Sequence, residues 1–208
     1  ADGTHIVFES LAKNFTASSN GLNNIYHVDT SVAHNVEQIS VATGGTEANG
    51  GSSNPSISED GSSIVFQSIA TNLNNLDNDG IADIYLHYRP SGRTELLTVN
   101  PINNAESGDD ASSNPHISGN AEYVAFESKA SNLASGSQLG TTSILVRNLN
   151  AWPGIIIEKL DTPASSQPSS TPAISTDGRY VSFHSAEKYS DDTDTLSDIF
   201  RMHNSTRP

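Results

Sequence analysis

The sequence predicts an all-β protein: a β-propeller built from four repeats of roughly 58 residues, each with four short antiparallel strands. The phrase GSSNPSISEDGSSIVFQS at 51–68 returns as ASSNPHISGNAEYVAFES at 111–128 and as PSSTPAISTDGRYVSFHS at 168–185. Apolar residues occur in short runs rich in Ile, Val, Tyr and Phe, which are bounded by Gly, Pro, Asn, Asp and Ser. Such runs are typical of short strands, and helical periodicity is absent.

Each repeat is predicted to begin with a hairpin. A turn dipeptide aligns in all four units, at 2–3, 60–61, 120–121 and 177–178. Asp-Gly favours a tight turn because glycine adopts a positive φ without a steric penalty and Asp hydrogen-bonds its own turn backbone. The third unit has Asn120-Ala121 at this place, so we expect a wider hairpin there.

Two further runs complete each unit. The third strand is expected at NIYHV, DIYLH, SILVR and DIFRM, and the fourth at VEQISV, TELLTV and IIIEKL. Four repeated strands describe a propeller blade better than a sandwich, whose strands need not repeat in sequence. We divide the single predicted domain, 1–208, into blades at approximately 1–50, 51–110, 111–167 and 168–208.

The second strand of each unit carries two residue types that recur. The recurring aromatic residues are predicted to form the core between blades, since aromatic side chains dominate buried area: Phe8, Phe66, Phe126 and Phe183. The serines two residues later indicate a shared structural hydrogen bond: Ser10, Ser68, Ser128 and Ser185.

Residues 53–68 and 171–185 resemble the WD40-like, or PD40, repeats of TolB-type β-propellers, whose units follow the pattern S-x-x-P-x-I-S-x-D-G-x-x-V-x-F-x-S. The resemblance spans nearly the whole chain and implies a propeller fold. It implies no single activity, because the family includes scaffolds, peptidase-associated domains and glycan-active enzymes. A secreted or periplasmic location of the bacterial type is expected with it.

The first and last predicted blades are incomplete, with three strands each. A propeller closes its ring, usually by combining its two termini in one blade. Three explanations stay open: a segment of a longer propeller, a ring completed by a second copy through an exposed strand edge, or a small four-bladed ring with one incomplete blade.

The composition is that of a globular chain with a large negative charge. Among 208 residues, 24 are acidic and 10 basic, for a formal net charge of -14. This balance repels phosphate, and no cluster of Lys and Arg reverses it locally, so nucleic acid is not expected as a partner. No apolar stretch reaches the ~20 residues of a membrane helix, so no membrane span is predicted. Without cysteine there is no disulfide framework and no thiol nucleophile.

The stretch NLDNDGIAD at 75–83 is the most informative local motif. Oxygen-bearing side chains at alternating positions around a glycine are suited to a hard cation such as calcium. The predicted ligands are Asn75, Asp77, Asp79 and Asp83. The twelfth position is Leu86 rather than Glu, which excludes an EF-hand. Turns held by Asn and Asp side chains are the alternative explanation. Unit four has a related stretch at 192–198.

Catalytic motifs are missing from the sequence. The seven histidines form no H-E-x-x-H, and no G-x-S-x-G is present. His116 and His184 are predicted to lie on strands, at variable positions of the repeat that give access to the central channel or to a blade surface. Packing or solvent exposure is the expected role of each, because a lone histidine has no partner that sets its pKa. The carboxylate pair Asp109-Asp110 is predicted in a loop, where a solvated turn is the ordinary explanation.

We therefore expect a non-catalytic binding or assembly module rather than an enzyme: a scaffold for protein-protein interaction, stabilised by calcium as its expected cofactor. Its expected partner is another protein, or a second copy bound through exposed strand edges. The alternative is an extracellular propeller that binds or cleaves glycans.

Overall fold

The structure, a computed structural model, describes residues 3–16, 20–32, 35–151, 154–160, 168–185 and 198–203, the last range as backbone alone. Throughout these residues the chain is all-β, with fourteen strands and no helix. The predicted fold class is confirmed: an incomplete β-propeller whose sheets have three, four, four and three strands. No helix in the described part is long and apolar enough to span a membrane.

Each sheet is an antiparallel meander of strands that follow one another in sequence. The first contains β1 (His5–Ser10), β2 (Asn24–Asp29) and β3 (Val36–Gln38). The second contains β4 (Ser52–Ile57), β5 (Ser63–Ser68), β6 (Asp83–Tyr88) and β7 (Arg93–Leu96). The third contains β8 (Ser112–Ile117), β9 (Tyr123–Ser128), β10 (Ser143–Asn148) and β11 (Ile156–Lys159). The fourth contains β12 (Ser169–Ile174), β13 (Tyr180–Ser185) and β14 (Asp198–His203).

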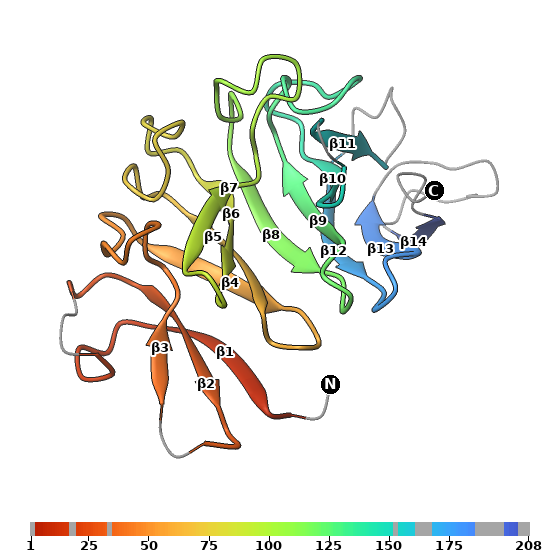
Figure 1. Cartoon of the computed structure of the whole chain (residues 1–208). Coiled ribbons are helices and arrows are strands. Elements are labelled where there is room, and N and C mark those ends of the chain that lie inside the picture. The colour runs from red at the N-terminus through yellow and green to blue at the C-terminus, as the bar shows by residue number, and fades with distance from the viewer. Residues whose placement is uncertain are drawn as a thin grey trace.

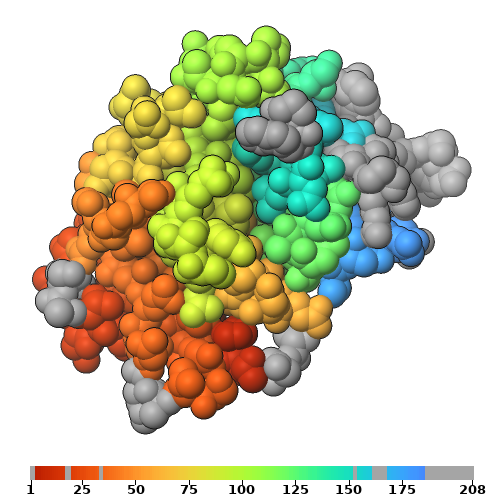
Figure 2. Space-filling model, viewed as in Figure 1, coloured from red at the N-terminus to blue at the C-terminus, as the bar shows by residue number. Residues whose placement is uncertain are grey.

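The four sheets succeed one another along an arc, and their first strands lie on its inner side (Figure 1). Strand β4 contacts β1 on one side and β8 on the other, and β8 contacts β12. The space-filling view shows the sheets packed in the same order (Figure 2). One strand from every sheet therefore borders a common axis.

The core lies between neighbouring sheets. Phe66 packs with Ile25 of the first sheet, Phe126 packs with residues of the second, and Phe183 packs with residues of the third. All three are at most 1% exposed, which agrees with the predicted core between blades. Phe8 differs: it is half-buried and stacks on Tyr26 of its own sheet.

The serine prediction is also confirmed. The Oγ atoms of Ser52 and Ser68 lie 3.0 Å apart, and the equivalent pairs in the third and fourth sheets lie 2.9 and 3.1 Å apart. The hydroxyl of Ser68 also accepts the backbone N–H of Ala70. Each pair ties the beginning of the inner strand to the end of the second strand.

The expectation of a wider third hairpin is wrong. The Ala121 N–H donates to the Ser118 carbonyl at 3.0 Å, as the Gly61 N–H does to Ser58 at 3.1 Å. Asn120 accepts a 2.7 Å hydrogen bond from the Ser118 hydroxyl and so replaces the Asp of the other turns. Ala121 takes φ = 56°, close to the 70° of Gly61. The side-chain hydrogen bond keeps the turn tight, and an alanine occupies a backbone conformation that favours glycine.

Candidate functional site

Every inner strand that the structure describes contains a bulge at the residue before a proline. Asn54, Asn114 and Thr171 have φ values of 51°, 50° and 52°, and the pairing with the second strand shifts register at each of them. Left-handed backbone at residues other than glycine is sparsely populated and needs support from its surroundings.

That support comes from the preceding sheet. The N–H of Asn54 donates to Glu9 Oε2 at 2.9 Å, and the N–H of Asn114 donates to Gln67 Oε1 at 3.2 Å. The N–H of Thr171 donates to Glu127 Oε1 at 2.7 Å. Sequence reasoning missed this role, although its signal was present: an acceptor follows the recurring phenylalanine at 9, 67 and 127.

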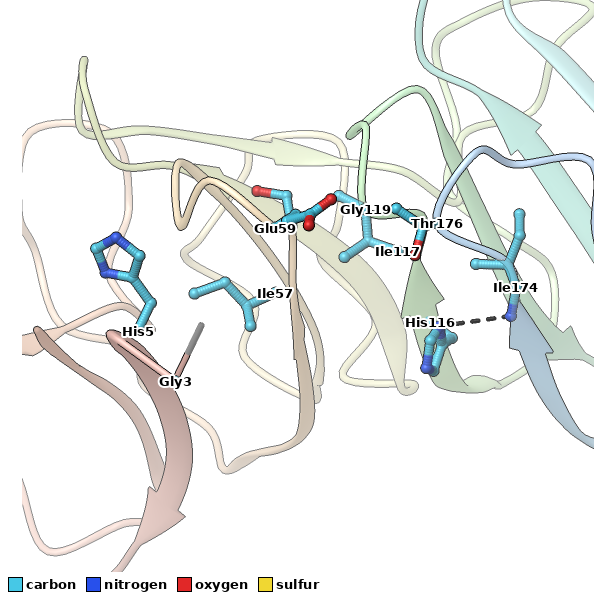
Figure 3. A pocket seen from close by; sticks show the side chains of 10 residues that line it. Gly3, His5, Ile57, Glu59, His116, Ile117, Gly119, Ile174 and Thr176 are labelled. Carbon is cyan, nitrogen blue, oxygen red and sulfur yellow. Dashed lines mark hydrogen bonds between the residues drawn. The ribbon is translucent and has the colours of Figure 1, made fainter. Parts of the chain in front are cut away.

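Residues of all four sheets line an open recess between the ends of the inner strands, which we call the axial recess (Figure 3). The recess has a volume of about 180 Å³. Its walls combine apolar side chains of the three inner strands with the imidazole of His5, the carboxylate of Glu59 and small residues of the turns. The apolar wall is formed by Ile57, Ile117 and Ile174. Each of these isoleucines is the last residue of its inner strand, so the repeat places the same side chain at the equivalent position of three sheets.

His116 lines this recess. This position corresponds to the central channel, which is one of the two places that the sequence made accessible to it. Its Nδ1 accepts the N–H of Ile174 at 3.5 Å, which joins the third sheet to the fourth (Figure 3). Burial lowers the pKa of His116, so the ring is neutral at neutral pH. His116 also lines a second, shallower groove, which lies at the bulges and is lined by Pro115 and Pro172 as well. His184 is half-buried on β13, 3.4 Å from the Ser170 hydroxyl, and lines neither space.

The acidic loop lies at the opposite end of the second sheet, where β5 has ended and β6 begins. Carboxylate oxygens of Asp77, Asp79 and Asp83 all lie within 4.8 Å of one another. Asp77 and Asp83 are each 1% exposed, whereas Asp79 is exposed. Asn75, the fourth predicted ligand, is exposed on the same loop, and its participation stays a prediction.

The two buried carboxylates have specific neighbours. Tyr85 donates its hydroxyl hydrogen bond to Asp77 Oδ2, and Thr98 donates one of 2.5 Å to Asp83 Oδ1. Burial, followed by the charges of Asp77 and Asp79, raises the pKa of Asp83 to about 8 although the Thr98 hydrogen bond opposes the shift. Burial likewise raises the pKa of Asp77. The fold thus holds two carboxylates where water solvates them poorly.

The other acidic pair has a structural role. Asp109 accepts hydrogen bonds from the N–H and hydroxyl of Ser131, at 2.6 and 2.5 Å. Asp110 accepts the N–H of Ala111 at 2.7 Å. The Asp109 contacts hold two loops of the third sheet together, whereas the Asp110 contact is local to its own loop.

Comparison of the sequence with protein-family models and with curated proteins gives no match. Comparison of the structure does. TolB from Acinetobacter baumannii matches 89% of this chain and 36% of its own, at 18% identity and a TM-score of 0.53. A TolB from Agrobacterium tumefaciens, described as putative by its title, matches 97% of this chain and 58% of its own, at 17% identity and a TM-score of 0.60.

A puromycin-hydrolyzing peptidase of Mycobacterium tuberculosis matches 97% of this chain and 29% of its own, at 10% identity and a TM-score of 0.52. The chain thus spans about a third to three fifths of the length of the TolB chains that it matches. At these identities the likeness concerns the fold alone. The protein has the fold of a TolB-like β-propeller.

Proposed function

We propose that this propeller is a non-catalytic binding module that holds an extended segment of a protein partner in its axial recess. The observation that carries the proposal is the convergence of all four sheets on this one space. A cavity between rigid sheets loses little conformational entropy when it binds, because its walls are already ordered.

The lining indicates the chemistry of the segment. Three isoleucines provide an apolar wall, and the Glu59 carboxylate adds a negative charge to the lining of the recess (Figure 3). The whole chain carries a net charge of -14, which attracts basic partners over long distances. We therefore expect segments that combine an apolar side chain with Lys or Arg.

Peptides selected from a random library on the immobilised full chain provide the probe. We expect enrichment of sequences with apolar and basic residues, followed by a measurable Kd for the best peptide in fluorescence polarisation. Thr176→Arg places a cation at an exposed position of the recess wall and is expected to weaken binding about tenfold or more. The matched control is Thr46→Arg, at an exposed threonine of the loop after β3. Absence of enriched peptides, or equal affinity for the Thr176 variant and the control, would contradict the proposal.

The proposal extends to self-association through the first sheet. In the described residues β1 pairs with β2 alone, whereas β5, β9 and β13 pair on both sides. Ile6 of β1 is 48% exposed, whereas Ile64 of β5, its equivalent, is buried. An unpaired strand edge beside exposed apolar surface favours pairing with another chain. We expect a concentration-dependent dimer in light scattering, and a chain that stays monomeric would contradict this part. A secreted or periplasmic location is part of the same proposal and rests on the likeness of fold.

A further inference from the structure

The loops before β2 and before β6 occupy the same place in their sheets. Asn24 pairs with Ser10 at the beginning of β2, and Asp83 pairs with Ser68 at the beginning of β6. The Ser40 hydroxyl donates to Asn24 Oδ1 at 2.9 Å, as the Thr98 hydroxyl does to Asp83 Oδ1 at 2.5 Å. One oxygen of each side chain is therefore satisfied in the same way.

The other terminal atom differs. Asn24 Nδ2 donates to Asn20 Oδ1 at 3.0 Å and to the Leu22 carbonyl at 3.1 Å. In the second sheet a carboxylate oxygen, Asp83 Oδ2, replaces this donor, and Asp79 has the place of Asn20. When it is ionised, Asp83 has no hydrogen to donate, so in that state acceptors face an acceptor. Asp83 Oδ2 is buried and has no hydrogen-bond partner among the described residues.

We propose that the loop of the second sheet binds a calcium ion through Asp77, Asp79 and Asp83. A cation supplies what the amide supplies in the first sheet: a positive group between oxygens that otherwise repel one another. Buried carboxylates are found paired or on metals because an isolated buried charge is costly. The proposal is independent of peptide binding, since the loop and the axial recess share no residue.

The donor set favours calcium among the divalent cations. All three proposed ligands are carboxylates, which suit hard cations rather than zinc or copper. Two ligand atoms of one calcium ion lie at most about 4.8 Å apart, given Ca–O bonds of about 2.4 Å. The carboxylate oxygens meet this limit. Magnesium requires shorter bonds and stricter octahedral geometry, so we expect it to bind more weakly.

The third sheet provides an internal contrast. It has Ser137 and Ser143 where the second sheet has Asp77 and Asp83, so this loop carries no negative charge at those positions. The fourth sheet repeats the acidic spacing with Asp192, Asp194 and Asp198, whose side chains lie outside the described residues. Experiments must therefore count the bound ions.

The test compares the full chain with a variant that carries Asp79→Asn and Asp83→Asn, which recreates the amide pair of the first sheet. Calcium bound per chain is counted by isothermal titration calorimetry, and Tm is measured in excess calcium, in magnesium and in chelator. We expect calcium to raise the Tm of the wild type by roughly 5–10 °C at saturation. The variant is expected to bind one ion fewer and to be at least as stable in chelator as the wild type.

Removal of two charges elsewhere controls for net charge. Glu106→Gln with Asp110→Asn makes the same change of charge at two side chains outside the cluster, and it is expected to leave calcium binding unchanged. A wild type that binds no calcium overturns the proposal, as does a double variant that binds as many ions as the wild type. A variant that is less stable than the wild type in chelator contradicts the argument from the amide pair.

Discussion

The first and second sheets of this propeller have the same antiparallel arrangement of strands. They differ in the burial of their recurring phenylalanine and in the charge of the loop before their third strand. In the second sheet, Phe66 is buried against the first sheet, and the loop before β6 brings three carboxylates together. In the first sheet, Phe8 is half-buried, and the equivalent loop is closed by an amide pair, Asn20 and Asn24. Strand pairing therefore depends little on loop chemistry, and the repeat can change the polar side chains of this loop without changing its fold.

The largest expected effect separates the two phenylalanines. Phe66→Ala should lower the free energy of unfolding by about 3–5 kcal/mol, because it leaves a cavity between two sheets. Phe8→Ala should cost roughly half as much, since Phe8 is only half-buried and its ring packs on Phe15 and on Tyr26 of its own sheet. Urea unfolding measures both. Equal losses would mean that another chain covers Phe8, and a difference that shrinks as protein concentration rises would indicate the proposed dimer.

Acid should affect the first sheet through His27, which is 1% exposed. Burial, followed by the charge of Arg89, lowers its pKa from 6.5 to about 4 although Glu37 opposes the shift. His5 and Asp29 are its other titratable neighbours. The native pKa lies below the unfolded one, so the unfolded chain binds the proton more tightly. Stability is thus full above pH 6.5 and falls toward pH 4, by about 3 kcal/mol in total.

Urea unfolding at several pH values, in the presence of chelator, measures how the free energy of unfolding changes with pH. His27→Gln is expected to flatten this dependence between pH 6.5 and 4. His87 of the second sheet hydrogen-bonds Thr94, and its pKa is also lowered by burial, so His87→Gln should reduce the slope as well. An unchanged slope in the His27 variant would show that the native pKa of this histidine does not lie below its unfolded value.

The smallest expected effects concern the turns. Ala121→Gly should stabilise the third sheet by about 0.5–1 kcal/mol, because the positive φ no longer strains a Cβ. Gly61→Ala should destabilise the second sheet by more than this gain, since it adds a methyl group that collides with the His5 ring of the first sheet. Thermal unfolding of the two variants measures both changes in stability: we expect a higher Tm for Ala121→Gly and a lower Tm for Gly61→Ala. A stabilising Gly61→Ala would contradict the close packing of the turn on the first sheet.

Much of this architecture could be predicted from local sequence. Short apolar runs and Asp-Gly turns specify strands and hairpins within a few residues, and a repeated phrase implies repeated sheets. The roles of Phe66, Phe126 and Phe183 and of the recurring serines were predicted correctly for the same reason: each acts within its own repeat or on the adjacent one. Phe8 is the exception, since it is only half-buried. The third turn was mispredicted because Asn120 replaces Asp in a hydrogen bond that the dipeptide alone does not reveal.

The acidic loop shows where such reasoning ends. Its spacing predicted a cation site, but only packing decides that Asp77 and Asp83 are buried while Asp79 and Asn75 are exposed. The same holds for the acceptors Glu9, Gln67 and Glu127, whose partners lie 44 to 47 residues away in the next sheet.

By itself, the sequence determined the strands, their order and their repetition, because these depend on interactions between near neighbours in the chain. Tertiary structure alone decided that Ile57, Ile117 and Ile174 line one recess and that Asp83 Oδ2 is buried away from solvent. Both outcomes depend on how closely separate sheets approach one another, and that distance is fixed by the packing of side chains from different repeats.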